Sequence, residues 1–395
     1  MSRLDLELAL RAARDAPDSI PEILRRAAAP MGATEVIVYL VDFAHTTLEP
    51  LPDRSPHRAV PHSEPVDSSL AGRTFVSGTC ATAERSDGHW VWAPIVEGTD
   101  RTGVVALGFT EARDDAIEAA EEAGLLTGYL IATHARTTDF YSLYRRRRSL
   151  SLAASMQWDI LPPLVLKTAG VVITGLIEPA YDVGGDFFDY ALNGSVLDFA
   201  IVDAMGHGVT SALVSALIAG CYRHDRREGQ SLDSMHQQLE RVLAQYWPKL
   251  TFATGQLGQL DVDTGQLQWT NAGHPLPLLV RGGQVVGELE CAPTLPWGIA
   301  AGAGRNDPPG VATVALEPGD GVLFYTDGVV EARVNGGEMF GIERLIDHVG
   351  RHASDQEEPE EVVRHIANSV LEYRAAELAD DATLVMVRWN GPDRI

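Results

Sequence analysis

Four aspartates, each beside an apolar run, carry the residue types and spacing that metal chemistry needs. They are Asp186 in VGGDFFDY, Asp203 in FAIVDAMGHG, Asp327 in VLFYTDGVVEA and Asp380 in AELADDATLVMV. The last three adjoin hydrophobic runs that we expect to form buried strands: Val196–Val202, Val322–Tyr325 and Ala382–Val387. A carboxylate at the edge of a buried sheet is costly unless it is paired or binds a cation. Because the nearby sequence offers few basic partners, the pattern predicts a divalent metal site.

The first motif presents two aspartates and a glycine pair. Asp186 and Asp189 lie three residues apart, so on a strand they face opposite ways. Asp186 follows the glycines, which permit a close approach to a ligand, and we expect it to enter the site. The GGDEF signature of cyclic-dinucleotide synthesis is a rival interpretation, but Phe187 stands where that signature needs an acid.

The second motif predicts a strand that ends at Asp203 and a glycine loop that leads into a helix. The carboxylate of Asp203 can hold metal, and the carbonyl of Ala204 is expected to point into the same space; an N-cap for the helix is the alternative role of Asp203. His207 in this loop is either a proton donor near a leaving group or a plain loop histidine.

Two further motifs complete the set. Asp381 beside Asp380 adds another oxygen donor, and the hydroxyl of Thr383 can fix the rotamer of a neighbouring carboxylate. Asn271 and His274 flank a glycine turn in WTNAGHP, where we expect a rigid structural corner rather than catalysis. Oxygen ligands alone favour magnesium or manganese over zinc.

The elements that must position these residues divide into more than one domain, as 395 residues predict. Residues 20–110 are typical of a small α/β unit. Apolar spacing predicts a long helix over residues 111–161, whose apolar stripe needs either a dimer partner or its own domains. The remainder mixes helices with antiparallel strands, including a hairpin of 252–262 and 266–271, and predicts an α+β layered fold.

Composition excludes several classes of protein. The formal net charge is −24, from 55 acids and 31 bases, which argues against nucleic acid as a partner. The three cysteines, Cys80, Cys221 and Cys291, have neither disulfide-framework nor zinc-ligand spacing. Apolar runs are too short for a membrane span and the start of the chain does not resemble a secretory signal, so we expect a cytoplasmic protein without a membrane partner.

Five motifs in order, GGDFFD, VDAMGHG, NAGHP, YTDG followed by EA, and DDAT, resemble the series of the bacterial PP2C-type (PPM) phosphatases of the SpoIIE/RsbU group. The resemblance covers about residues 165–390. Residues 20–135 resemble a GAF sensor domain less specifically, and SLAASMQWDILPP is similar to the helix that joins sensor and phosphatase in this family. We therefore expect a GAF-like domain over 1–135, a helical linker over 136–164 and a phosphatase domain over 165–395.

The resemblance implies a β-sandwich flanked by helices, with two Mn²⁺ or Mg²⁺ ions between the sheets. Its ligands would be Asp186, Asp203, the Ala204 carbonyl, Asp327, Asp380 and Asp381, with Asp203, Asp327 and His207 as catalytic residues. Eukaryotic relatives carry glycine at the position of Ala204 and histidine at that of Met205, and a match to their phosphate-binding arginine is not evident here. Two such ions roughly 4 Å apart can activate water for in-line displacement at phosphorus.

The expected function is therefore metal-dependent hydrolysis of phosphoserine or phosphothreonine. The resemblance implies a phosphorylated anti-sigma-factor antagonist of the STAS type as substrate, and regulation by the GAF-like domain, which binds a small molecule or transmits a protein contact. We expect a homodimer through the helical linker. The alternative is a non-enzymatic, ligand-sensing signalling module that uses a phosphatase-like fold as an interaction platform.

Overall fold

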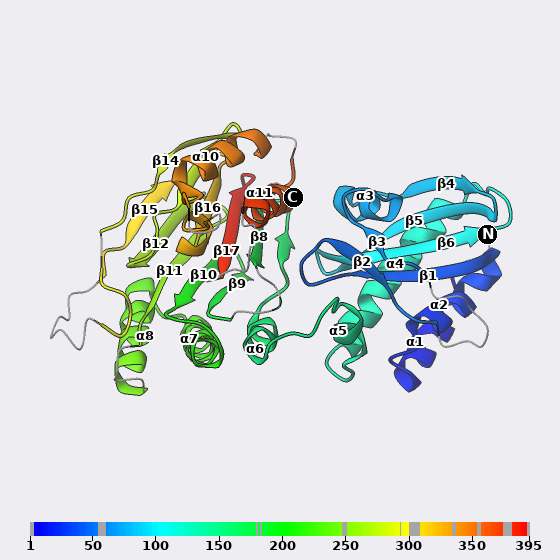
Figure 1. Ribbon diagram of the computed structural model, residues 1–395, viewed down its shortest axis with the longest axis horizontal. Coiled ribbons are helices and arrows are strands. Elements are labelled where there is room, and N and C mark those ends of the chain that lie inside the picture. The colour runs from blue at the N-terminus through cyan, green and yellow to red at the C-terminus, as the bar shows by residue number, and fades with distance from the viewer. Residues whose placement is uncertain are drawn as a thin grey trace. The chain divides into compact units, whose positions relative to one another are not determined.

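A computed structural model describes residues 4–53, 61–178, 181, 184–246, 251–292, 294–299, 309–333, 337–353, 357–373 and 381–392. The chain forms two compact units, Met1–Ser149 and Leu150–Ile395, which are drawn in Figure 1. Within the described residues, the helices are all too short or too polar to cross a membrane.

The first unit is built on a six-stranded antiparallel sheet in the order β3-β2-β1-β6-β5-β4. Its strands are β1 (Ala33–Val41), β2 (Thr47–Pro50), β3 (Glu64–Pro65), β4 (Ala81–Arg85), β5 (Gly88–Glu97) and β6 (Asp100–Phe109). The helices are α1 (Leu6–Asp15), α2 (Ile20–Ala28), α3 (Leu70–Ser77), α4 (Ala116–His134) and α5 (Phe140–Tyr144), with a 3₁₀ turn at Ala29–Met31. One core lies under α1, α2 and α4, and another lies under α3.

The prediction of one continuous helix over 111–161 is wrong. The segment forms α4, α5 and α6 (Leu152–Ile160), and short polar side chains hydrogen-bond the backbone at both breaks. Thr137 donates to the carbonyl of His134 where α4 ends, and the hydroxyl of Ser151 accepts from the amide of Ala154 at the start of α6. Such bonds compete with the helical pattern and favour helix ends.

Helix α4 uses most of its apolar residues within its own unit. A Cβ atom at Gly124 would lie 2.3 Å from the carbonyl oxygen of Pro94, so the helix packs closely on β5. Ile117, Leu125 and Tyr129 remain on the outer side of α4, with 46%, 64% and 58% of their surface exposed. Packing within the unit therefore accounts for one face of the helix and leaves these three residues on the other.

The second unit contains two antiparallel sheets, in the orders β15-β12-β11-β10-β9 and β14-β13-β16-β17-β8-β7. The strands are β7 (Val165–Lys167), β8 (Val171–Glu178), β9 (Asp186–Asn193), β10 (Val196–Ala204), β11 (Ala253–Asp261), β12 (Gln266–Ala272), β13 (Leu278–Arg281), β14 (Gln284–Glu288), β15 (Ala312–Ala315), β16 (Gly321–Tyr325) and β17 (Ala382–Trp389). Besides α6, the helices are α7 (Val209–Arg227), α8 (Leu232–Tyr246), α9 (Asp327–Val330), α10 (Gly341–His352) and α11 (Pro359–Tyr373).

These elements form a helix–sheet–sheet–helix sandwich, with α7 and α8 on one outer face and α10 and α11 on the other (Figure 1). Alternate residues of each inner face meet in the core, where the rings of Phe199 and Phe324 contact edge to face at 5.0 Å. The predicted hairpin of β11 and β12 is confirmed. The sandwich is the fold expected for this part of the chain. The motifs lie together at one end of it, where β10 and β16 end and β9 and β17 begin.

Candidate metal centre

Asp186 and Asp203 lie side by side across two neighbouring strands. Asp186 begins β9, Asp203 stands one residue before the end of β10, and the two are direct partners in the antiparallel register. Opposed residues of an antiparallel pair share one face of the sheet. The apolar run of β10 is buried up to Val202 and thereby brings the carboxylate of Asp203 to the strand end.

The carboxylate of Asp186 is held by two hydroxyl groups from the other sheet. Its Oδ2 accepts hydrogen bonds from Thr326 Oγ1 at 2.8 Å and from Thr383 Oγ1 at 2.6 Å. The expectation that Thr383 orients a carboxylate is confirmed. Burial, then the charges of Asp203 and Asp381, raise the pKa of Asp186 well above its usual value. The negative charges of these aspartates therefore repel one another, and a bound cation would reduce that repulsion.

Asp381 ties the start of β9 to the start of β17. Its Oδ2 accepts from the amides of Gly185 at 2.7 Å and Asp186 at 3.2 Å, and from Gln157 Nε2 at 3.1 Å. Gln157 also donates to the carbonyl of Asp186 at 2.8 Å. Backbone donors aimed at a buried carboxylate favour its charged form. The backbone amides of the GGD turn therefore hold the carboxylate of Asp381 in a fixed orientation.

Asp327 is brought to the same place by the next strand of the second sheet. It follows β16 and begins the short helix α9. A Cβ atom at Gly328 would lie only 1.8 Å from the carbonyl oxygen of Asp381, so the glycine permits the two segments to touch. Thr326, on the other side of Asp327, makes the bond to Asp186. The remaining candidate, Asp380, lies outside the described residues.

Ala204, the last residue of β10, is buried inside the site, and the loop that follows leaves the side chain of His207 exposed to solvent. The amide of Ala204 donates to the carbonyl of Gly185 at 3.3 Å, and Ala204 is fully buried. Gly206 and Gly208 both have positive φ values, 88° and 83°, that only glycine adopts readily. The side chain of His207 between them is exposed, so the buried network does not include it.

The Asn271–His274 turn is the rigid corner that its sequence predicts. Asn271 Nδ2 donates to the carbonyl of His274 at 2.9 Å, and the amide of His274 donates to Asn271 Oδ1 at 2.7 Å. His274 Nδ1 lies 2.9 Å from Thr254 Oγ1, and Thr254 is the register partner of Asp203. Burial lowers the pKa of His274 to about 3, so the ring is neutral. The corner supports the strand next to Asp203.

Two supporting residues were not predicted from the sequence. Gln157 reaches the site from α6, and the local sequence around it carries no ligand or capping signal. Arg223 of α7 forms an ion pair with Asp189, at 2.6 Å from Nε to Oδ2, and donates to the carbonyl of Ile160 at the end of α6. Asp189, the second aspartate of the first motif, thus pairs with an arginine, while Asp186, the first, lies in the cluster of aspartates.

The candidate ligand atoms of this cluster of aspartates suit magnesium or manganese. Asp186, Asp203, Asp327 and Asp381 come from both sheets, and every candidate ligand atom is oxygen, including the carbonyl of Ala204. Hard divalent cations prefer such ligands. The residues that could hold the ions therefore come from strand ends of both sheets, at the same end of the sandwich.

Comparison with known proteins defines the class. The fold is that of the PP2C phosphatases: the SiaA-PP2C domain of Pseudomonas aeruginosa matches with a TM-score of 0.50 and 23% identity, over 60% of this chain and 94% of that domain. The model of the Stage II sporulation protein E (SpoIIE) family matches residues 193–390, half of the chain. The protein belongs to this family, the bacterial PP2C-type serine phosphatases.

Two characterised proteins show how far the similarity reaches. Phosphoserine phosphatase RsbU of Bacillus subtilis is 25% identical over 246 residues, which are 61% of this chain and 70% of RsbU. Protein IcfG of Synechocystis is 24% identical over 277 residues, which are 62% of this chain and 42% of IcfG. The chain therefore spans most of one relative and less than half of the other.

Proposed function

We propose that the protein is a protein serine/threonine phosphatase that depends on two Mn²⁺ or Mg²⁺ ions. The observation that carries the proposal is the gathering of carboxylates from both sheets around the buried Asp186, in a member of a phosphatase family. Asp186, Asp203, Asp327, Asp380 and Asp381 would hold the ions together with the carbonyl of Ala204. The ions, when bound, supply an activated water and offset the charge of the phosphate oxygens.

The chain's own residues fix the geometry in which this chemistry occurs. Thr326 and Thr383 hold the rotamer of Asp186, and the GGD amides hold that of Asp381. Groups held in advance at the site need no reorganisation during the reaction. His207, on the exposed loop next to Ala204, is the proposed donor of a proton to the departing serine or threonine oxygen.

A protein substrate is supported by the surface beside the carboxylates. Met205, Val209 and Leu213 follow Asp203 at four-residue spacing and expose 45%, 41% and 44% of their surface. Exposed apolar groups beside a reactive centre favour contact with another protein. The resemblance to the SpoIIE/RsbU group supports a phosphorylated STAS-type anti-sigma-factor antagonist as that substrate.

The experiment that tests the proposal is hydrolysis of p-nitrophenyl phosphate and of a phosphoserine protein, with and without Mn²⁺. Asp203→Asn is expected to abolish the metal-dependent rate, while Asp263→Asn, in the exposed β11–β12 turn, keeps it. Full activity of Asp203→Asn would refute the metal-site assignment. An inactive wild type that also fails to bind Mn²⁺ by calorimetry would favour the non-enzymatic signalling module.

Regulation by the N-terminal unit is proposed to act through α6. The first unit combines a six-stranded sheet with helices on both faces, which supports a GAF-like sensor. Helix α6 begins three residues after that unit ends, and its Gln157 contacts Asp381. A small molecule or protein that binds the sensor would alter the site by shifting this helix.

The homodimer was expected through the helical linker of 136–164, but the exposed residues Ile117, Leu125 and Tyr129 support one formed through the outer face of α4, which precedes that linker. Their side chains follow one side of the helix, where a second copy would cover them. Light scattering of the full chain at micromolar concentration is expected to give a dimer, and Leu125→Glu a monomer. A wild type that stays monomeric would contradict this proposal without affecting the phosphatase assignment.

A further inference from the structure

A second cluster of ligand-type side chains lies where α10 ends and α11 begins. His352 is the last residue of α10, Glu357 precedes α11, and His365 stands in the second turn of α11. One possible ligand atom from each residue lies within 4.8 Å of the other two. All three side chains are half-buried, so an ion from solvent can reach them. The cluster is separate in sequence from every aspartate of the candidate metal centre.

The geometry of the cluster is close to that of a shared ligand set. The rings of His352 and His365 lie 4.5 Å apart between centroids, with 18° between their planes. Glu357 Oε1 lies 3.4 Å from His365 Nε2. Ligands that bind one ion at about 2.0–2.2 Å lie roughly 3–4 Å from one another. The terminal ring torsion of histidine has a broad range, so a rotation of the half-exposed His352 ring turns its nitrogen toward the other two ligands.

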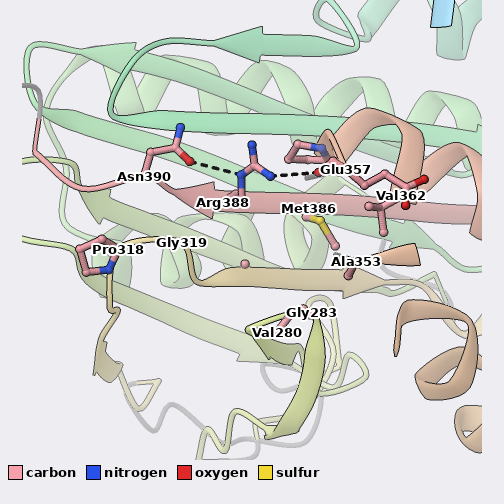
Figure 2. Close-up of a pocket in the computed structure, with 12 residues that line it drawn as sticks. Val280, Gly283, Pro318, Gly319, Ala353, Glu357, Val362, Met386, Arg388 and Asn390 are labelled. Atoms are coloured by element: carbon pink, nitrogen blue, oxygen red, sulfur yellow. Dashed lines mark hydrogen bonds between the residues drawn. The ribbon is translucent and has the colours of Figure 1, made fainter. Parts of the chain in front are cut away.

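The backbone of Glu357 is held in place by the neighbouring strand. Arg388 Nη1 on β17 donates to the carbonyl oxygen of Glu357 at 3.1 Å, as Figure 2 shows. Glu357 also lines a pocket of about 290 Å³ beside this strand. The backbone of Glu357 is therefore held by a hydrogen bond from β17 of the sandwich.

The basic groups around the cluster have their own acidic partner. Lys167 Nζ lies 2.7 Å from Glu358 Oε2, and Arg388 Nη2 lies 3.6 Å from the same oxygen. Arg351, next to His352, pairs with Asp347 along α10. Glu358 and Asp347 thus pair with these cations, while the carboxylate of Glu357 lies against the ring of His365.

We propose that His352, Glu357 and His365 bind a late first-row divalent cation of the Zn²⁺ class, with water completing the coordination. Two imidazoles and one carboxylate form the ligand set that suits this class, whereas magnesium requires oxygen ligands. The ion joins the end of α10 to α11 and so stabilises the outer helical layer of the sandwich. The competing explanation is a histidine–glutamate ion pair with a stacked ring, which needs no ion.

Calorimetry of the metal-free, full-length protein with Zn²⁺ separates the two explanations. Excess Mg²⁺ is kept present so that the oxygen-only aspartate centre is occupied. Wild type is expected to bind one equivalent of Zn²⁺ and to gain thermal stability. His352→Ala and His365→Ala are expected to lose both effects, while His224→Ala, which removes an exposed histidine on α7, keeps them.

Glu357→Gln preserves the size of the side chain and is expected to weaken Zn²⁺ binding at least tenfold. Circular dichroism verifies that each variant is folded, and His365→Gln replaces His365→Ala if the latter unfolds. Zn²⁺ binding by wild type that persists in both histidine variants would overturn the proposal, because the ion would then occupy the aspartates or a cysteine. Absence of Zn²⁺ binding by wild type would overturn it equally.

Discussion

Replacing Gln157 by leucine tests whether α6 supports the metal centre. The side chain is 2% exposed, and its Nε2 donates at 2.8 Å to the carbonyl of Asp186 and at 3.1 Å to Asp381 Oδ2. Leucine fills nearly the same volume but donates neither bond. Two acceptors inside the protein then lose a donor, and one of them is a carboxylate.

The size of the effect follows from the two bonds. A hydrogen bond to a charged group contributes about 1.5–3 kcal/mol and a neutral one about 1 kcal/mol. We therefore expect the free energy of unfolding to fall by about 2–4 kcal/mol. Loss of a residue that orients a metal-binding carboxylate lowers metal affinity or activity by about 10–100-fold. The Mn²⁺ concentration for half-maximal activity should rise by that factor.

The assay is p-nitrophenyl phosphate hydrolysis over a Mn²⁺ titration, with chemical unfolding measured on the same samples. Asp159→Asn is the matched control, since Asp159 is exposed on the same helix. Gln157→Glu retains the shape but places an acid beside Asp381, and it is expected to raise the Mn²⁺ requirement as well. If Gln157→Leu and Asp159→Asn gave the same Mn²⁺ titration, the support ascribed to Gln157 would be refuted.

Two further predictions concern histidines. His207→Gln should slow phosphoserine hydrolysis by about 10²-fold but hydrolysis of p-nitrophenyl phosphate much less, because nitrophenolate leaves without a proton; equal losses on both substrates would exclude the donor role. Burial lowers the pKa of His236 to about 4 from 6.5, so its stabilising effect is complete above pH 6.5 and is lost as pH falls toward 4. The loss is about 3 kcal/mol. His236→Gln should flatten the dependence of unfolding free energy on pH over that interval, and an unchanged slope would contradict the cause given.

Much of the candidate site could be predicted because the carboxylates that could hold metal stand at strand ends. Asp203 follows a largely apolar run that predicts a buried strand, and Thr383 lies at the start of another. The bond between Gln157 and Asp381 joins residues 224 positions apart, and local spacing carries no information about such a contact. Helix breaks were also missed, since the polar caps at Thr137 and Ser151 interrupt an apolar pattern that alone predicts one helix.

Helix α6 packs closely against the phosphatase sandwich. A Cβ atom at Gly184 would lie 2.7 Å from the carbonyl carbon of Ala153. The amide of Ser151 also donates to the carbonyl of Tyr181 at 2.8 Å. In a chimera that exchanges N-terminal units between homologues, α6 should therefore come from the same protein as the phosphatase sandwich. A fusion made before Ser151 keeps this contact, whereas one made at Pro162 would pair a foreign helix with a surface shaped for another.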